Sequence, residues 1–113
     1  IYGDGEQTRD FTYVANVVDG VLRAADTPGV GGEVFNVATS RRISLNELLR
    51  AMNGIIGTRL EAVYAEARAG DVMDSQADIR KAELVLGYRP LVSFEEGLRR
   101  TIGWYQSASP SVA

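Results

Sequence analysis

Apolar residues recur at helical spacing in four short stretches of the chain, and this periodicity limits the folds that are open to it. The first stretch predicts an amphipathic helix over residues 16–26 that begins at Asn16 or slightly earlier and ends at the loop 27–32. We expect one face of this helix to be buried, because its apolar stripe is nearly continuous: Val14, Val17, Val18, Val21, Leu22 and Ala25.

Start and stop signals define the other three helices. A Ser followed three residues later by Glu is a capping box, in which each side chain bonds a backbone amide of the first turn, and this signal occurs twice. An Asp before the pattern and a Gly after it bracket the remaining, shorter helix. The predicted helices are therefore 45–56 (Ser44 and Glu47), 79–86 (Asp78 and Gly87) and 94–106 (Ser93 and Glu96).

Extended runs separate these helices. Residues 1–13 are predicted to be extended with a Gly-rich turn at 3–5, residues 33–38 form a largely apolar strand typical of one covered on both faces, and residues 60–65 alternate as a strand does. The fold class is thus α+β, with about three short strands and four helices. These strands are too few and too short for a doubly wound sheet, so we expect a Rossmann domain to be absent from this chain and apolar surface to be left for such a partner domain.

Length and composition bound the function. The 113 residues allow one domain, and a net charge of −3 gives no general attraction to nucleic acid or to an acidic membrane. Cysteine and histidine are absent, which excludes disulfides, thiol nucleophiles, Cys/His zinc sites and His-based triads. No apolar run approaches membrane-spanning length. We expect a cytoplasmic protein, since the lack of cysteine is compatible with a reducing compartment.

Two arginines are candidate anion ligands. Arg9 precedes Asp10, and Arg68 is followed at short range by Gly70 and Asp71. A guanidinium can fork onto pyrophosphate oxygens, a glycine allows the backbone to come close, and a carboxylate can accept from ribose hydroxyls. These residues therefore suit a nucleoside diphosphate. On spacing alone, two surface ion pairs, Arg9 with Asp10 and Arg68 with Asp71, are the simpler interpretation.

Other chemistry is not visible in the chain. Tyr2 could stack on a base, although a tyrosine at a strand end more often packs in the core. The Gly-rich residues 29–32 lack the spacing of a dinucleotide-binding turn and lead into a predicted strand instead of a helix. Ala77 stands four residues before Lys81, where a reductase-type Tyr-x-x-x-Lys pair needs tyrosine. We therefore predict no catalytic, cofactor-binding or metal-binding residue in this chain.

A series of short motifs gives a more specific indication. They are Tyr2-Gly3-Asp4-Gly5, Gln7-Thr8-Arg9-Asp10-Phe11, Tyr13-Val14, Phe35-Asn36-Val37, Ser44-Leu45-x-Glu47-Leu48, Arg68-x-Gly70-Asp71-Val72, Ala77-Asp78, Leu86-Gly87-Tyr88-x-Pro90 and Phe94-Glu95-Glu96-Gly97-Leu98. In this order they resemble the C-terminal substrate-binding region of the NAD-dependent nucleotide-sugar epimerases and dehydratases. These enzymes are extended short-chain dehydrogenases/reductases and include the UDP-glucose 4-epimerases. The resemblance covers nearly the whole chain to Tyr105.

The resemblance implies a role for each candidate residue. In that family an N-terminal Rossmann domain holds NAD and the catalytic side chains, and the epimerases oxidise the sugar at C4 and return the hydride to the opposite face. Carried onto this chain, Arg9 and Arg68 contact the diphosphate. Asp71 bonds the ribose, and Tyr2 packs at the uracil. The expected partners are a UDP-sugar and the missing Rossmann domain of the same protein.

We accordingly expect a substrate-binding domain over residues 1–106 and a disordered tail over 107–113, inactive alone and cut from a UDP-glucose/UDP-galactose-type 4-epimerase. Two alternatives stay open. The chain could be the same region of a nucleotide-sugar dehydratase, which a preference for thymidine over uridine nucleotides would indicate. It could also be a non-catalytic interaction module, which would bind no nucleoside diphosphate.

Overall fold

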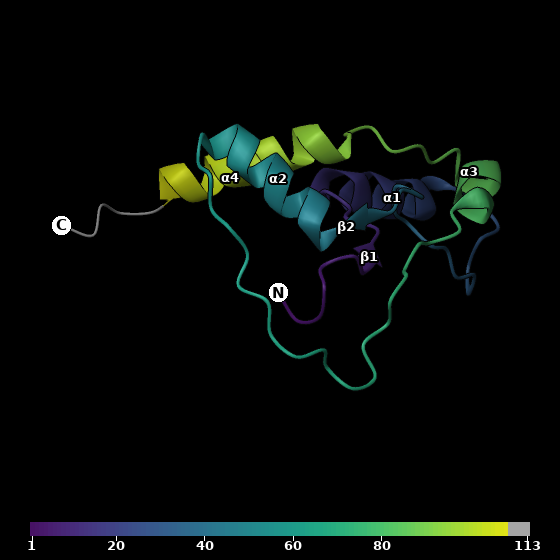
Figure 1. Cartoon of the computed structure of the whole chain (residues 1–113). Coiled ribbons are helices and arrows are strands. Elements are labelled where there is room, and N and C mark those ends of the chain that lie inside the picture. The colour runs from purple at the N-terminus through teal and green to yellow at the C-terminus, as the bar shows by residue number, and fades with distance from the viewer. Residues whose placement is uncertain (109–113) are drawn as a thin grey trace.

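Four helices and a two-stranded sheet make up the computed structural model, which describes residues 1–108. In chain order the elements are β1 (Thr8–Arg9), α1 (Val14–Asp26), β2 (Ile43–Ser44), α2 (Leu45–Ile56), α3 (Arg80–Leu86) and α4 (Phe94–Ala108). Helix α2 packs beside α4 and α3 beside α1, while the long segment between α2 and α3 loops round the N-terminus (Figure 1). The predicted α+β class and the four helices are confirmed.

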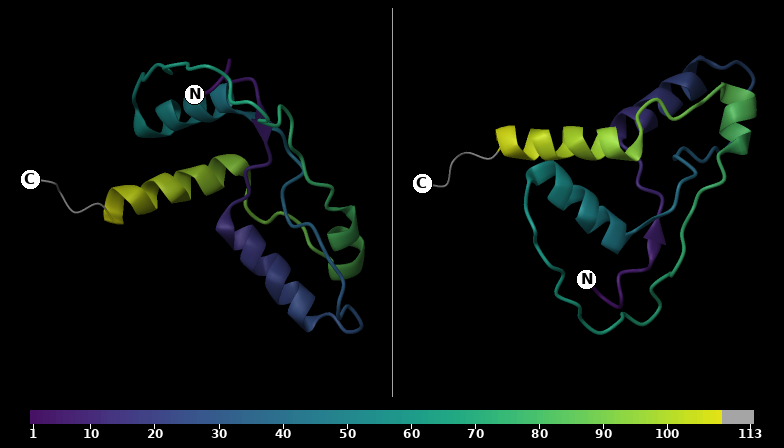
Figure 2. Two further views of the ribbon diagram at one scale, coloured as in Figure 1. Left: turned by 90° about the horizontal axis from the view of Figure 1, so that it is seen from below. Right: turned by 45° about the horizontal axis from the view of Figure 1, so that its top comes forward.

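The molecule is flat and open. Its principal extents are 50 × 37 × 20 Å, and its radius of gyration of 17.0 Å exceeds the value of about 13 Å for a compact chain of this length. Helices α2 and α4 lie toward one end, and α1 and α3 toward the other (Figure 2). The chain therefore does not close around one central core. No helix within residues 1–108 is both long and apolar enough to cross a bilayer.

The sheet is small but organises the N-terminal segment. β1 pairs with β2 in antiparallel register, Thr8 opposite Ser44 and Arg9 opposite Ile43. On its other side the N-terminal segment meets the long α2–α3 connection through two isolated parallel bridges, Tyr2 with Ala65 and Thr8 with Asp74. The N-terminal segment is thus held between β2 and this connection.

The strands predicted over 33–38 and 60–65 are wrong, because neither segment forms a ladder. Residues 60–65 contribute a single bridge, at Ala65. In the described part of the chain, the amides of residues 34–38 donate to no backbone carbonyl. An apolar or alternating pattern predicts a segment that suits a sheet, but a strand also needs a partner about 4.8 Å away. No such partner lies beside 33–38 within residues 1–108.

The apolar face of α1, predicted to be buried, is exposed. Its large apolar side chains are 40–62% exposed: Val14, Val17, Val18, Val21 and Leu22. The opposite face is the buried one and carries Asn16 and Gly20. A Cβ at Gly20 would lie 2.8 Å from the Val37 side chain, so glycine allows α1 to approach the 33–38 segment closely. Small and polar residues, instead of the valines, thus form the contact with the rest of the described chain.

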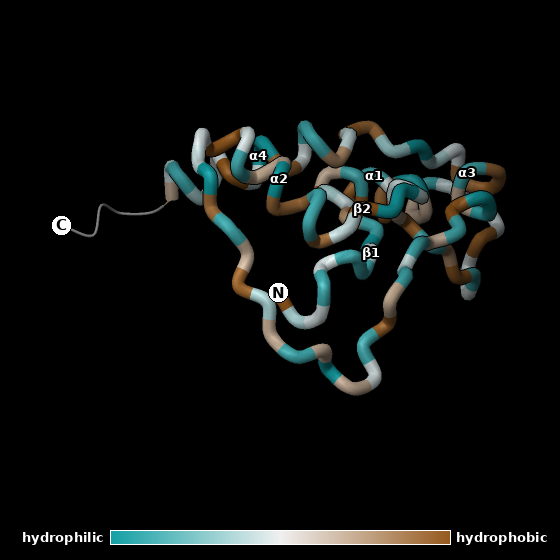
Figure 3. Tube along the Cα trace, in the orientation of Figure 1, coloured by the Kyte–Doolittle hydropathy of each residue, from teal (hydrophilic) through white to brown (hydrophobic). Residues whose placement is uncertain are grey.

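The core lies between α1, α3 and the segment before β2. It consists of Ala38, Ile79, Ala82, Leu86 and Tyr88, and hydrophobic residues are visible at α3 and between α2 and α4 (Figure 3). The Tyr88 hydroxyl donates to the Ala38 carbonyl at 2.7 Å. Burial is the main cause that raises the pKa of this phenol above its usual value. The tyrosine therefore fixes the end of the 33–38 segment against α3.

The predicted caps are confirmed to different degrees. Both halves of the capping box at Ser44 and Glu47 are present. Ser93 accepts from the Glu96 amide at 3.2 Å, but the Glu96 carboxylate pairs with Arg99 and Arg100 instead of reaching back, so this box is half formed. The structure thus supports two of the three helix starts through a serine side chain.

The third helix start and the end of the chain differ slightly from expectation. Asp78 accepts from the Arg80 amide at 3.0 Å, although Ile79 occupies the capping position of α3. Helix α4 continues to Ala108, so the predicted disorder at residues 107 and 108 is wrong. The rest of the predicted tail, 109–113, lies outside the described residues.

Candidate functional site

One cavity brings together three of the four predicted site residues. It measures about 360 Å³ and is lined by Ile1, Tyr2, Gln7, Leu45, Arg68, Ala69, Gly70 and Asp71. Arg9 is not part of its lining, but the Arg9 Nη2 donates to Asp71 Oδ1 at 2.8 Å. The four residues, which come from two segments about sixty positions apart in the sequence, therefore form one cluster.

Tyr2 and Arg68 stack on each other. The Arg68 Cζ lies 3.8 Å from the centroid of the Tyr2 ring, within the range of a cation–π interaction. Tyr2 is 46% exposed, so the interpretation as a core residue is wrong. Within residues 1–108 the Arg68 guanidinium makes no hydrogen bond or ion pair, so its N–H groups are available to a ligand.

Arg9 ties the two halves of the cluster together. Its Nη1 donates to the carbonyls of Thr8 and Val72, both at 2.7 Å, and its Nη2 donates to Asp71. These bonds use three of the five N–H groups of a guanidinium, which leaves two that have no partner in the described chain. Neither ion pair of the simpler interpretation, Arg9 with Asp10 or Arg68 with Asp71, forms within residues 1–108, and Arg9 pairs with Asp71 instead.

A tight turn presents Arg68 and Asp71. The Asp71 amide donates to the Arg68 carbonyl at 3.2 Å, which closes a four-residue turn. Gly70, the third residue of this turn, has a φ of +81°, as a type II turn requires at that position. A Cβ there would meet nothing within 4 Å, so conformation alone and not crowding makes glycine suitable.

The N-terminus of α2 approaches the same cavity, but its amides are already bonded. Leu45 N donates to the Gln7 carbonyl at 3.3 Å, Asn46 N to the Gly5 carbonyl at 3.0 Å, and Glu47 N to Ser44 Oγ at 3.1 Å. The Ser44 amide in turn donates to Glu47, and this bond is the main cause that lowers the pKa of the Glu47 carboxyl. An anion in the cavity would therefore depend on arginine side chains and not on helix amides.

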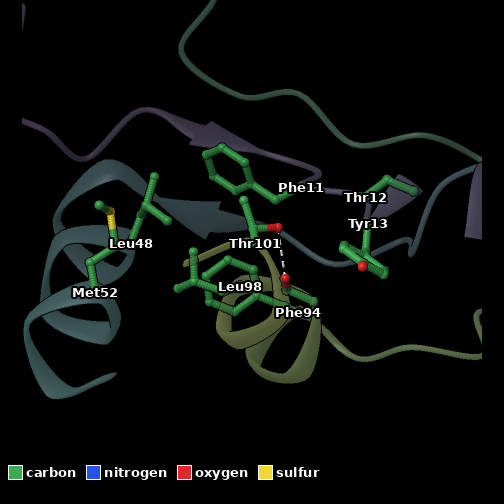
Figure 4. Close-up of a pocket in the computed structure, with 9 residues that line it drawn as sticks. Phe11, Thr12, Tyr13, Leu48, Met52, Phe94, Leu98 and Thr101 are labelled. Carbon is green, nitrogen blue, oxygen red and sulfur yellow. Dashed lines mark hydrogen bonds between the residues drawn. The ribbon is translucent and has the colours of Figure 1, made fainter. Parts of the chain in front are cut away.

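A second cavity, of about 300 Å³, lies between α2 and α4 below Phe11. Leu48, Met52, Phe94 and Leu98 point into it, and the Thr101 hydroxyl is bonded to a backbone carbonyl of its own helix (Figure 4). None of its lining residues is charged. This cavity suits apolar contact and offers no positive charge to a phosphate.

Gln7 and Leu45 also line the first cavity, although no role for either was predicted from the sequence. Gln7 lies in the same motif as Arg9, and this proximity to a predicted ligand-binding residue could have indicated that Gln7 belongs to the site. For Leu45 the sequence indicated only the start of a helix. Its position in the wall of the cavity depends on the hydrogen bonds between the first turn of α2 and the backbone of residues 5–7.

Residues 29–32 do not form a dinucleotide-binding turn. The Gly-rich loop 29–32 follows α1 and leads into 33–38, which is not helical, so no helix N-terminus faces a pyrophosphate there. Within residues 1–108 there is also no group of three or more acidic side chains able to hold a metal ion.

Comparisons with known proteins give a consistent result. The model of the family described as GDP-mannose 4,6 dehydratase matches residues 1–101. UDP-glucose 4-epimerase of Mycolicibacterium smegmatis is 38% identical over 109 residues, which are 96% of this chain and 34% of that protein. The chain thus spans about a third of the length of this relative.

Solved structures agree. The crystal structure of UDP-glucose 4-epimerase from Thermotoga maritima with UDP-glucose is 42% identical, with a TM-score of 0.88 over 95% of this chain and 34% of that one. The structure of MoeE5 with UDP-glucuronic acid and NAD is 38% identical, with a TM-score of 0.91 over 96% of this chain and 36% of that one. The chain therefore belongs to the extended short-chain dehydrogenase/reductase family of NAD-dependent nucleotide-sugar epimerases and dehydratases, and it matches their C-terminal region.

Proposed function

We propose that this chain supplies the nucleotide-binding part of an NAD-dependent UDP-sugar 4-epimerase of the UDP-glucose/UDP-galactose type. The observation that carries the proposal is the cavity that groups Tyr2, Arg68 and Asp71, with Arg9 bonded behind it. The N–H groups of Arg68 and the two unused ones of Arg9 suit the oxygens of a diphosphate. The Asp71 carboxylate suits the ribose hydroxyls, and the part of the Tyr2 ring that Arg68 leaves uncovered suits the uracil.

The chain would act by binding and orientation alone. A nucleotide anchored at Arg68 and Asp71 directs its sugar away from the anchor and toward the rest of the polypeptide, so affinity for the nucleotide positions the reacting end. The chain by itself is expected to have no epimerase activity, because the family's catalytic side chains and NAD belong to the other part of the protein. NAD supplies the hydride chemistry in these enzymes.

A titration of the chain with UDP at low salt tests this proposal. Saturable NMR shifts are expected at the amides of Gly70 and Asp71 and at the side chains of Arg9 and Arg68. Arg68→Ala should weaken UDP binding about tenfold or more, since hydrogen bonds to charged groups contribute roughly 1.5–3 kcal/mol. Arg89→Ala is the matched control, because Arg89 is exposed and makes no side-chain bond within residues 1–108.

The outcome separates two kinds of failure. Binding that Arg68→Ala leaves unchanged would mean that UDP binds elsewhere and that the assigned residues are wrong. No binding by the chain, followed by none after the chain is rejoined to the rest of the polypeptide, would refute the nucleotide-binding role itself.

We further propose that a Rossmann domain of the same polypeptide covers the exposed face of α1 and pairs with residues 33–38. The valine face of α1 and the unbonded amides of 34–38 both need a partner, and the chain spans only a third of its relatives. Hydrogen exchange at the amides of 34–38 should be fast in the chain alone and slowed at least tenfold in the longer polypeptide, because ladder bonds protect amides. Equal exchange in both would exclude this pairing.

A second candidate is the same region of a nucleotide-sugar dehydratase, and the description of the matching family model favours it. The two are distinguished by titrating UDP and dTDP in parallel. A clear preference for dTDP supports the dehydratase. If neither nucleotide binds and Arg9→Ala and Arg68→Ala change nothing, the chain is a non-catalytic interaction module.

A further inference from the structure

Gln7 places a buried amide in the wall of the cavity. The residue is only 5% exposed, and its Nε2 donates to the Tyr2 carbonyl at 2.6 Å. A carbonyl oxygen can only accept, so this contact requires the nitrogen end of the amide to face Tyr2. Arg68 and Asp71 line the same cavity with exposed side chains, whereas Gln7 is held within the fold.

The bond from Gln7 completes the support of Tyr2. On one edge the neighbours of Tyr2 are tied to Ala65, with Gly3 N donating to its carbonyl at 2.9 Å and Ala65 N donating to the Ile1 carbonyl at 2.8 Å. In a parallel bridge of this kind the carbonyl of the central residue points to the opposite edge. There Gln7 is its partner, so Tyr2 is held from both edges.

The first turn of α2 holds Gln7 in turn. Leu45 N donates to the Gln7 carbonyl, and Asn46 bonds the carbonyls of Asp4 and Gly5. The approach is close, since a Cβ on Gly5 would lie 2.2 Å from the Asn46 side chain. A chain of contacts therefore runs from α2 through Gln7 to Tyr2 and to the guanidinium of Arg68 stacked on it.

We propose that Gln7 is a positioning residue of the nucleotide site, whose amide fixes the Tyr2 backbone and thereby keeps the Tyr2 ring under Arg68. Only the identity of the ligand rests on the proposed function. The stack itself is a property of the chain without ligand. Gln7 acts through Tyr2 and Arg68, and we assign it no contact with the nucleotide.

The test uses Gln7→Glu and Gln7→Leu in the 113-residue chain. A protonated Glu can donate to the Tyr2 carbonyl as Gln does, whereas an ionised Glu can only accept and faces the carbonyl with a negative charge. Leu fills similar volume and cannot donate at any pH. Gln106→Glu, at an exposed position of α4, is the matched control for the added carboxyl. The readout is the ring-current shift of the Arg68 side-chain protons, with Tyr2→Leu as the unstacked reference.

At pH 8 the Arg68 shift should move to the unstacked position in Gln7→Glu and Gln7→Leu and stay in place in Gln106→Glu. As the pH falls through the titration of the introduced carboxyl, the stack should return in Gln7→Glu only. Binding of UDP, and of uncharged uridine as a probe free of charge repulsion, should weaken about tenfold at pH 8 and recover in parallel.

An Arg68 shift unchanged in Gln7→Glu at pH 8 overturns the proposal, as does wild-type protein without a ring-current shift. If the Arg68–Tyr2 stack is lost in Gln7→Glu to the same extent at pH 8 and at low pH, Gln7 acts only by packing, and this result would also overturn the proposal. If the stack responds as expected but neither the chain nor the longer polypeptide binds UDP, the role of Gln7 stands and the proposed function fails.

Discussion

Replacing Asn16 should reveal how much one buried amide contributes to this open fold. Asn16 is fully buried in α1, where its Oδ1 accepts from Leu91 N at 2.9 Å and Val92 N at 3.0 Å, and its Nδ2 donates to the Val92 carbonyl at 2.9 Å. These three bonds join α1 to the loop that leads into α4. Because the large apolar face of α1 is exposed, they are a major part of what holds the helix.

The magnitude follows from the bond count. Asn16→Ala leaves two amides and one carbonyl without a partner, and at about 1 kcal/mol for each bond the loss is roughly 3 kcal/mol of the free energy of unfolding. Asn16→Asp retains both accepting bonds, but it loses the donor and buries an ionised carboxylate against the Val92 carbonyl, so at neutral pH we expect a loss at least as large as that of Asn16→Ala. Asn36→Ala is the control, because Asn36 is exposed and makes one bond of 3.3 Å, so its loss should stay below about 0.5 kcal/mol.

Urea unfolding followed by far-UV circular dichroism measures these differences. With a slope of about 1–3 kcal/mol per molar, the midpoint of Asn16→Ala should fall by about 1 M or more. Trp104 is 62% exposed and is therefore a poor fluorescent reporter of this transition. An Asn16→Ala midpoint that matches that of the control would refute the argument, as would an Asn16→Asp loss no larger than that of the control.

Three other outcomes are expected. Gly70→Ala should lower the free energy of unfolding by about 1–2 kcal/mol, because Gly70 has a φ of +81°, and it should weaken UDP binding. Gly54→Ala, inside α2, should instead raise the free energy of unfolding. Urea unfolding and UDP titration compare the two variants. Bonds from Arg80 lower the pKa of Asp78 from 3.8 to about 2, so this carboxylate stabilises the fold above pH 3.8 and the effect is lost as the pH falls through about 2; an NMR titration should show the pKa return toward 3.8 in Arg80→Gln. Val18→Glu should leave the circular dichroism unchanged, since Val18 is 51% exposed, and should reduce self-association in light scattering.

Local signals predicted the helices well because helical spacing, and at α2 both a start and a stop, can be read from neighbouring residues. The capping box at Ser44 and Glu47 and the glycine stop of α2 at Gly57 are both present, and they depend only on neighbours in the sequence. The strand predictions were wrong for the opposite reason. A strand is defined by a partner elsewhere, and the two-residue pairing of β1 with β2 joins positions whose sequence carries no alternation to predict it.

Periodicity also predicted which face of α1 is apolar but not what covers it. The valine stripe is real, yet the described chain packs against Asn16 and Gly20 on the other side. Hydrophobic spacing predicts a face that suits burial, and only the surrounding structure decides whether burial occurs within the same segment. The resemblance named four site residues, and three of them line the cavity, while the Arg9–Asp71 and Gln7–Tyr2 bonds could not be read from the sequence.

The location of the cavity follows from the unequal lengths of two bridged segments. The bridges Tyr2–Ala65 and Thr8–Asp74 mark the ends of both segments, and they are six residues apart on the first and nine on the second. The second segment therefore has more residues between the two bridges than the first segment has, and the turn that carries Arg68 and Asp71 accommodates the extra residues. Arg9 donates to the Val72 carbonyl and to the Asp71 carboxylate, and these bonds hold the turn against the N-terminal segment. A short sheet with mismatched connections can thus build a turn that presents arginine side chains without a helix N-terminus, and under the proposed function the arginines supply the positive charge that α2, with its amides already bonded, cannot.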